Sequence, residues 1–166
     1  KSLIENTAIP EAVYQKFDKS STQLQAKFQA EKHVFLTPVW GMWFRMKTGI
    51  LKNDNLFLNE LSRFGGLRSI RGFNELYFFA DRYAFLNFEQ RLFFGRGSYL
   101  MVFGDFGMLN NPFTTPRIDR PRSFGLGINL DTDGGLFSFV FGMGKSAFQP
   151  ATISQARIHF GYLARF

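Results

Sequence analysis

Long stretches of the chain alternate hydrophobic and polar residues with a period of two. In residues 22–36 the even positions are mostly hydrophobic and include Leu24, Phe28 and Val34, whereas the odd positions are mostly Gln, Lys, Glu or His. Because successive side chains of a β-strand point to opposite faces, this pattern predicts a strand with one apolar face. The alternation recurs in residues 39–51, 84–94, 98–108, 123–131, 135–145 and 157–166. It predicts an all-β, antiparallel fold of about seven or eight strands.

The length and composition of these stretches favour strands that cross a membrane. They run over roughly 9 to 14 residues, whereas strands of soluble proteins average nearer five or six. Phe occurs 23 times in the 166 residues and dominates the apolar positions, while the opposite positions combine charged residues with Gly. This combination suits lipid on one side and a polar lumen on the other, and it predicts a transmembrane β-barrel. The alternative is a soluble β-sandwich adhesin, which detergent-free solubility would support.

The connections between the predicted strands give a second indication. Short connections at 37–38, 95–97 and 132–134 alternate with long ones at 53–83, 109–122 and 146–156. Outer-membrane barrels have short periplasmic turns and long extracellular loops, so we expect an outer-membrane protein with a periplasmic C-terminus. Residues 1–21 are expected to form an outer loop or an incomplete strand. Since bacterial barrels normally have an even number of strands, we expect residues 1–166 to be only part of a barrel.

Three sequence motifs follow one another along the chain, and the first of them lies in the longest connection. Residues 64–73 read Phe-Gly-Gly-Leu-Arg-Ser-Ile-Arg-Gly-Phe, residues 87–89 read Asn-Phe-Glu, and residues 103–107 read Phe-Gly-Asp-Phe-Gly. Together they resemble the signature of the BamA/TamA family, also called the bacterial surface antigen family. The resemblance singles out Gly65, Gly66, Ile70, Arg71, Gly72, Phe73, Glu89, Phe103, Asp105 and Gly107.

The C-terminal residues resemble the β-signal of outer-membrane proteins. His159 supplies its polar residue, Gly161 its glycine and Phe166 its terminal aromatic, whereas Ala164 fits the hydrophobic third-last position weakly. The family resemblance implies the C-terminal half of a barrel of about 16 strands, an even number in the bacterial range. It also implies an insertase for other outer-membrane proteins. Its partners would be lipid and lipopolysaccharide, client proteins, and periplasmic or lipoprotein subunits.

Two other membrane functions are alternatives, and the first of them shares the Arg-Gly-Phe/Tyr loop. One is a secretion pore of the two-partner type, and the other is a barrel that anchors a passenger enzyme such as a patatin-like lipase. The three functions differ in the domains expected before the barrel: several POTRA repeats for the insertase, two with a plug helix for the pore, and a lipase domain for the anchor.

Arg71 is the residue for which the sequence predicts a specific contact. Strand parity places Glu89 and Asp105 on the inner face of adjacent strands. Gly65, Gly66 and Gly72 allow tight backbone turns, so the loop can fold back into the lumen. A guanidinium that leaves water needs partners, and we expect the two carboxylates to provide them. Phe103 is expected to pack beside the loop tip.

Several other chemistries lack the residues they need. The chain has no Cys, and its two histidines, His33 and His159, fall on different predicted strands, so we expect no catalytic centre, metal site or cofactor. The net charge of +7 is scattered rather than concentrated in a run, which argues against nucleic acid as a partner. Residues 142–146 read Gly-Met-Gly-Lys-Ser, but the first glycine of a phosphate loop is replaced by Phe139.

Overall fold

The structure is a computed structural model that describes residues 22–95 and 97–165. The expectations for residues 1–21 and for Phe166 lie outside this part of the chain. The main strands are β1 (Gln23–Thr37), β2 (Trp40–Asn53), β5 (Arg82–Phe93), β6 (Tyr99–Asn110), β8 (Arg122–Thr132), β9 (Gly135–Lys145) and β10 (Arg157–Ala164), with the short β7 (Ile118–Asp119). Among the described residues, no helix is both long and apolar enough to cross a membrane.

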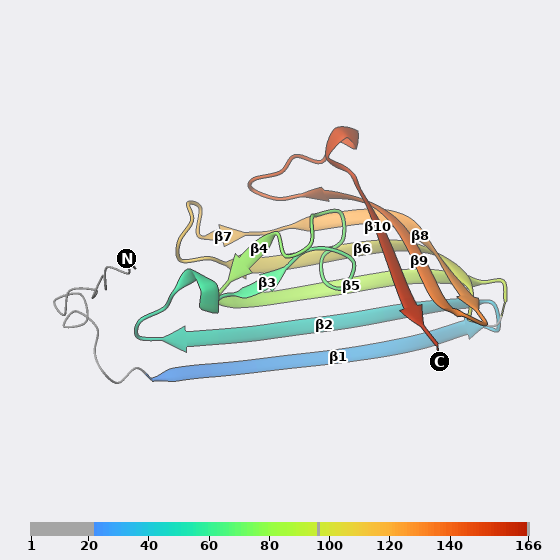
Figure 1. Ribbon diagram of the computed structural model, residues 1–166, viewed down its shortest axis with the longest axis horizontal. Coiled ribbons are helices and arrows are strands. Elements are labelled where there is room, and N and C mark those ends of the chain that lie inside the picture. The colour runs from blue at the N-terminus through green and yellow to red at the C-terminus, as the bar shows by residue number, and fades with distance from the viewer. Residues whose placement is uncertain (1–21, 96, 166) are drawn as a thin grey trace, which may run out of the picture.

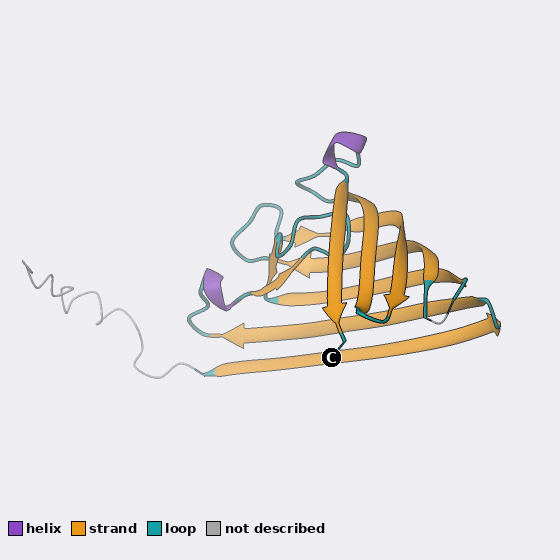
Figure 2. Ribbon diagram, turned by 45° about the vertical axis from the view of Figure 1, so that its right-hand side comes forward, coloured by secondary structure: helices purple, strands orange, loops and turns teal. Residues whose placement is uncertain are grey.

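The strands form one antiparallel sheet. Its order is β1-β2-β5-β6-β8-β9-β10, and β7 pairs with the far end of β6. The sheet is strongly curved, so that β8, β9 and β10 turn across the other strands (Figures 1 and 2). Within the described residues β1 and β10 do not pair, and the sheet is therefore open. The all-β, antiparallel prediction is confirmed, and the closed barrel stays a prediction.

The two faces of the sheet differ as the alternation predicts. On the convex face, the side chains of Phe124, Leu126 and Phe160 are between 58% and 60% exposed. On the concave face, the side chains of Phe103 and Val140 are 2% and 1% exposed. The Phe side chains that parity places outward are exposed or half-exposed, namely Phe88, Phe124, Phe137, Phe139, Phe141 and Phe160. The apolar convex surface therefore has no covering layer among the described residues.

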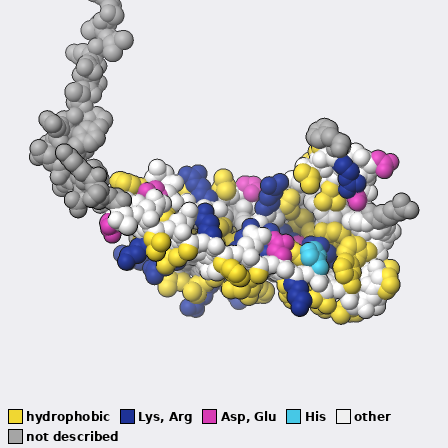
Figure 3. Space-filling view, turned by 90° about the horizontal axis from the view of Figure 1, so that it is seen from below, with side chains coloured by type: hydrophobic (Ala, Val, Ile, Leu, Met, Phe, Trp, Pro, Cys, Tyr) yellow, Lys and Arg dark blue, Asp and Glu magenta, His cyan; other side chains and the backbone are white. Residues whose placement is uncertain are grey.

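The edge of the sheet at β1 carries both hydrophobic and charged side chains. Seen from below, the molecule shows hydrophobic side chains with Lys and Arg side chains interspersed (Figure 3). Lys32 is exposed on β1, where its pairing partner is Phe44. Lys32 is thus a charged residue at a position that parity assigns to the convex face.

The longest connection contains more structure than the sequence predicts. The expected loop at 53–83 is shortened at both ends, because β2 extends to Asn53 and β5 begins at Arg82. Inside it are a 3-10 turn (Leu58–Glu60) and a hairpin of β3 (Ser62–Phe64) and β4 (Phe78–Ala80). The hairpin forms because its hydrophobic side chains pack on the concave face, in a cluster of Phe64, Ile70, Phe73, Phe78, Ala80, Phe85 and Leu109.

The proline-rich connection after β6 also differs from the expected loop at 109–122. Two residues between Pro116 and Pro121 form β7, and they continue the pairing of Leu109 and Asn110. Pro121 follows without a backbone N–H, but its carbonyl accepts a hydrogen bond from the N–H of Gly107 at 2.7 Å. A short strand between prolines was not predicted, because proline cannot donate a backbone hydrogen bond and a proline-rich segment therefore predicts a loop.

Candidate functional site: the Arg71 lock

The loop between β3 and β4 turns tightly before it reaches the sheet. Gly65 and Gly66 have φ angles of 122° and 89°, which glycine adopts readily and other residues rarely do. The Gly65 N–H donates to the Ser69 hydroxyl at 2.7 Å, and the Gly66 N–H donates to the Ile70 carbonyl at 3.1 Å. The turn is thereby fixed and directs the next residue, Arg71, toward the concave wall.

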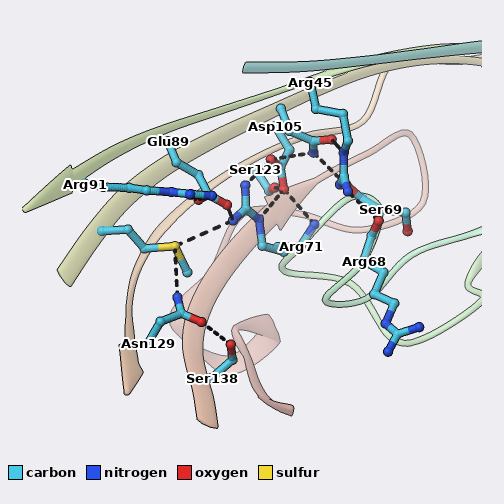
Figure 4. A network of polar contacts seen from close by, with 12 residues as sticks. Arg45, Arg68, Ser69, Arg71, Glu89, Arg91, Asp105, Ser123, Asn129 and Ser138 are labelled. Atoms are coloured by element: carbon cyan, nitrogen blue, oxygen red, sulfur yellow. Dashed lines mark hydrogen bonds and ion pairs between the residues drawn. The ribbon is translucent and has the colours of Figure 1, made fainter. Parts of the chain in front are cut away.

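Arg71 is buried against β5 and β6, with 3% of its surface exposed. Its Nε donates to Oδ2 of Asp105 at 2.9 Å, and its Nη2 donates to Oδ1 at 2.7 Å, so the pair is bidentate (Figure 4). The Arg71 backbone N–H also donates to Oδ2, at 2.8 Å. Its Nη1 is bonded to Oε1 of Glu89. We call Arg71, Glu89 and Asp105 the Arg71 lock.

Phe103 forms the floor of the lock. The centre of the Arg71 guanidinium lies 3.9 Å from the centroid of the Phe103 ring. The ring is 2% exposed, so the cation lies over a desolvated aromatic face. Phe103 is close to the loop tip, as predicted, and it contacts the guanidinium itself.

Each carboxylate of the lock has further donors. The Asn87 amide donates to Oδ1 of Asp105 and to the Ser69 carbonyl, both at 2.7 Å. Asn87 in turn accepts from Nε of Arg45 at 2.8 Å. Glu89 pairs through its second oxygen with Arg91, at 2.6 Å. The contacts of Arg45 and Arg91 were not predicted, although both are inward-facing basic residues, Arg91 on the strand that carries Glu89 and Arg45 on its neighbour β2.

The balance of charge explains why these groups can be buried together. Burial by itself lowers the pKa of the Arg71 guanidinium, but hydrogen bonding to Asp105 and attraction from both carboxylates outweigh it and raise that pKa above its ordinary value. Arg71 therefore stays charged at any pH at which proteins are studied. Arg71 and Arg91 together offset the two carboxylates, which is the condition under which buried charges are tolerated.

Gly72 brings the loop into contact with the last strands. Its N–H donates to Nε2 of His159 on β10 at 3.1 Å, and its carbonyl accepts from the Gln149 amide at 3.2 Å. Gly72 has a φ of 79°, and a Cβ there would lie 2.9 Å from the backbone nitrogen of Gly144 on β9. A Cβ at Gly142 would lie 2.9 Å from the Gly72 nitrogen. The two β9 glycines thus leave room for the loop backbone.

Sequence reasoning missed the roles of Gln149, Gly142 and Gly144. The two glycines fall on the predicted inner face, which is the signal that could have found them, since glycine in a strand often marks a close backbone approach. His159 was predicted only as the polar residue of a β-signal. The structure adds a hydrogen bond between this residue and the loop.

The remaining loop residues of the motif pack rather than form polar contacts. Ile70 and Phe73 are completely buried. A Cβ at Gly107 would lie 2.9 Å from Cδ1 of Ile70, so this glycine makes space for the Ile70 side chain. Phe73 packs edge-on against Phe78, with ring centroids 4.7 Å apart.

The described residues of the predicted β-signal lie in different surroundings. Gly161 faces the loop, and a Cβ there would lie 2.6 Å from Cδ2 of Leu67. Ala164 ends β10 opposite Gly135, away from the lock. Phe166 lies outside the described residues.

The lock can hold segments together, and its groups are engaged in doing so. All three nitrogens of the Arg71 guanidinium donate to the two carboxylates, Nη1 also lies 3.9 Å from the sulfur of Met101, and the face of the group lies over the Phe103 ring. In the described part of the chain, no group of three or more His, Asp or Glu residues is placed to hold a metal ion. Neither a family model nor a curated protein matches this chain.

Proposed function

We propose that this chain is part of an outer-membrane β-barrel that assists the folding and insertion of other barrel proteins. The observation that carries the proposal is the Arg71 lock, in which a loop arginine is tethered to carboxylates of two adjacent strands. These residues stand in the motif order that resembles the BamA/TamA family. In this proposal the concave face lines a polar lumen and the apolar convex face contacts lipid.

The edge of the sheet at β10 is where a client strand would bind. β10 has 8 residues and β9, its neighbour, has 11, so β10 is the shorter partner in the pairing. On its other side β10 pairs with no strand among the described residues. An edge of this kind presents free backbone donors and acceptors, which can template the addition of another strand.

The lock supports this role because it joins the loop to the edge strand. Arg71 is held by β5 and β6, and the adjacent Gly72 is hydrogen-bonded to His159 of β10. The loop thereby fixes β10 relative to the centre of the sheet, while the outer edge of β10 pairs with no strand in the described part of the chain. We propose that the protein acts by this templating and without covalent catalysis.

A folding assay tests the proposal. The full-length protein is placed in liposomes, and an unfolded barrel protein is added with a chaperone. We expect faster appearance of membrane-integrated, protease-resistant client, and we expect Arg71→Ala to reduce that rate. The matched control is Arg68→Ala, which removes an exposed arginine of the same loop. A client that passes into the vesicle interior would instead support a secretion pore, and no effect on the client would support a passenger anchor.

Cross-linking tests the position of the client. Residues 1–166 contain no Cys, so a single introduced Cys is unique within them. Leu163→Cys on β10 should form disulfides with a client that carries Cys in its last strand. Phe148→Cys, at an exposed position in the loop before β10, should not. Equal cross-linking at both positions would argue against strand addition at this edge.

A further inference from the structure

The convex face changes character at the end of the sheet that borders the long loops. Its middle is apolar apart from Lys32 at the β1 edge, but at this end the exposed positions carry Lys52 on β2, Arg82 on β5, Arg122 on β8 and Lys145 on β9. At the other end of the strands, the exposed residues Leu36, Leu92 and Leu100 are apolar. One boundary of the convex surface is thus basic, whereas these three described residues at the other boundary are apolar.

The basic residues are most concentrated around a hollow between β6, β8 and β9. The hollow has a volume of about 630 Å³ and is lined by Arg120, Arg122 and Lys145 together with Phe106 and Ile118. Its one acidic lining residue, Asp119, is turned to the concave side, where it is 7% exposed and accepts a hydrogen bond from the Ala147 N–H at 2.9 Å. The hollow therefore combines exposed cations with an apolar wall.

The three cations have no acidic partner within the part of the chain that the structure describes. Arg122 and Lys145 are direct cross-strand partners, an arrangement in which like charges destabilise a sheet. Within the described residues, no ion pair involves Arg120, Arg122 or Lys145. By comparison, Arg82 on the same boundary has Asp81 at 3.6 Å. An anion from outside the chain would remove the repulsion between Arg122 and Lys145.

We propose that Arg120, Arg122 and Lys145 bind the phosphate group of a phosphorylated lipid in the adjacent membrane leaflet. Arginine forms paired hydrogen bonds with phosphate, and a lysine adds a compact charge. A phosphate monoester carries a charge between about −1.5 and −2 at neutral pH, which three cations can balance.

The apolar surface beside the cations selects a lipid over a free anion. Phe106, Ile118, Phe124 and Met108 are between 51% and 58% exposed, and Phe106 and Ile118 are part of the hollow itself. An acyl chain attached to the bound phosphate would cover this surface. The inference rests on the proposed membrane function, because only a membrane supplies such a ligand at this face. It deepens that function by assigning a lipid contact beside the strands that hold the lock.

Lipid retention by the purified protein tests the inference. The full-length protein is exchanged into nanodiscs that contain phosphatidylethanolamine and a trace of a diphosphorylated glycolipid, and the bound lipid is measured by native mass spectrometry after release. Arg122→Gln should weaken retention of the glycolipid about tenfold, the order expected for lost hydrogen bonds to a charged group. Combining it with Arg120→Gln and Lys145→Gln should abolish the preference for the phosphorylated form.

Matched controls make the result specific. Arg117→Gln removes the same charge from an exposed position in the same connection, outside the hollow, and should change retention less than twofold. Equal retention of the dephosphorylated glycolipid would overturn the proposal, as would equal loss in Arg122→Gln and Arg117→Gln. Full displacement of the glycolipid by millimolar inorganic phosphate would show a free-anion site and would also overturn it.

The outcomes separate this inference from the proposed function. The same nanodisc samples are tested for acceleration of client folding. Selective lipid retention without client folding would support the lipid site and count against the insertase. Client folding without selective lipid retention would support the insertase and count against the lipid site. A protein that fails to integrate into nanodiscs or to float with vesicles would overturn both.

Discussion

Arg71 and Asp105 are joined by three hydrogen bonds, two from the guanidinium and one from the Arg71 backbone N–H. The donor–acceptor distances lie between 2.7 and 2.9 Å, and the Asp105 side chain is fully buried. Both the side chain and the main chain of the loop are therefore positioned by one carboxylate. A change at Asp105 removes more than an ion pair, because it also frees the loop backbone.

Asp105→Asn should loosen the loop more than Glu89→Gln does. The asparagine keeps the shape but leaves Arg71 buried with reduced charge compensation, and breaking a buried pair costs about 3 to 5 kcal/mol. Glu89→Gln should have the smaller effect, since Arg71 keeps its bidentate pairing with Asp105. Hydrogen exchange of the amides in residues 65–73 measures the difference. Equal protection in the two variants would show that Asp105 contributes no more to the lock than Glu89 does.

Arg71→Lys should behave much like Arg71→Ala. Lysine keeps the charge but cannot present the planar pair of donors that matches the Asp105 carboxylate. We expect both variants to expose the loop to protease, whereas Arg68→Ala should not, because that side chain is exposed. Limited proteolysis of the protein after reconstitution with lipid measures the cleavage rate. Full protection in Arg71→Lys would mean that charge alone holds the loop.

Gly72→Ala should displace the loop from β9 by steric contact. A Cβ at this residue would lie 2.9 Å from backbone atoms of Met143 and Gly144, and the φ of 79° adds strain. Gly134→Ala is the control, since a Cβ there meets only the Thr132 hydroxyl at 4.0 Å. Cleavage between residues 65 and 73 should rise for the first variant only. An unchanged loop in Gly72→Ala would contradict the close approach to β9.

Phe139→Arg should destabilise the folded protein in a bilayer by about 2 to 4 kcal/mol, the range for a charged residue on the lipid side of a barrel. Phe139 is 44% exposed on the convex face of β9. The control is Phe148→Arg, at a position 52% exposed in the connection before β10. Denaturant titration in lipid vesicles gives the free energies of unfolding. Similar effects for the two substitutions would count against lipid at the convex face.

Strand alternation predicted the face on which each strand residue lies, and this was enough to place Glu89 and Asp105 together. The two residues fall on neighbouring strands with the same parity, so their distance is nearly fixed once the strands pair. The structure contains the predicted contact of Arg71 with both carboxylates, although the sequence of the loop motif alone does not predict that contact. It needed the family resemblance to indicate that the loop folds inward.

The contacts of Gly72 could not be predicted in the same way. His159 and Gln149 are 87 and 77 residues away from Gly72, and no local pattern relates such positions. Their proximity depends on the curvature that carries β9 and β10 across the loop, and alternation contains no information about curvature. The β3–β4 hairpin was missed for a related reason, since three-residue strands are too short to show a period.

The long sequence separation between Gly72 and His159 has a consequence for the order of folding. The binding surface for the loop consists of β5, β6, β9 and β10, so it exists only when these strands have paired and the sheet has curved. Contacts between distant residues require closure of the intervening chain before they gain any energy. The loop should therefore dock last, and until then Ile70 and Phe73 are left exposed to water. The loop would therefore dock only on a sheet whose strands have paired in the correct register.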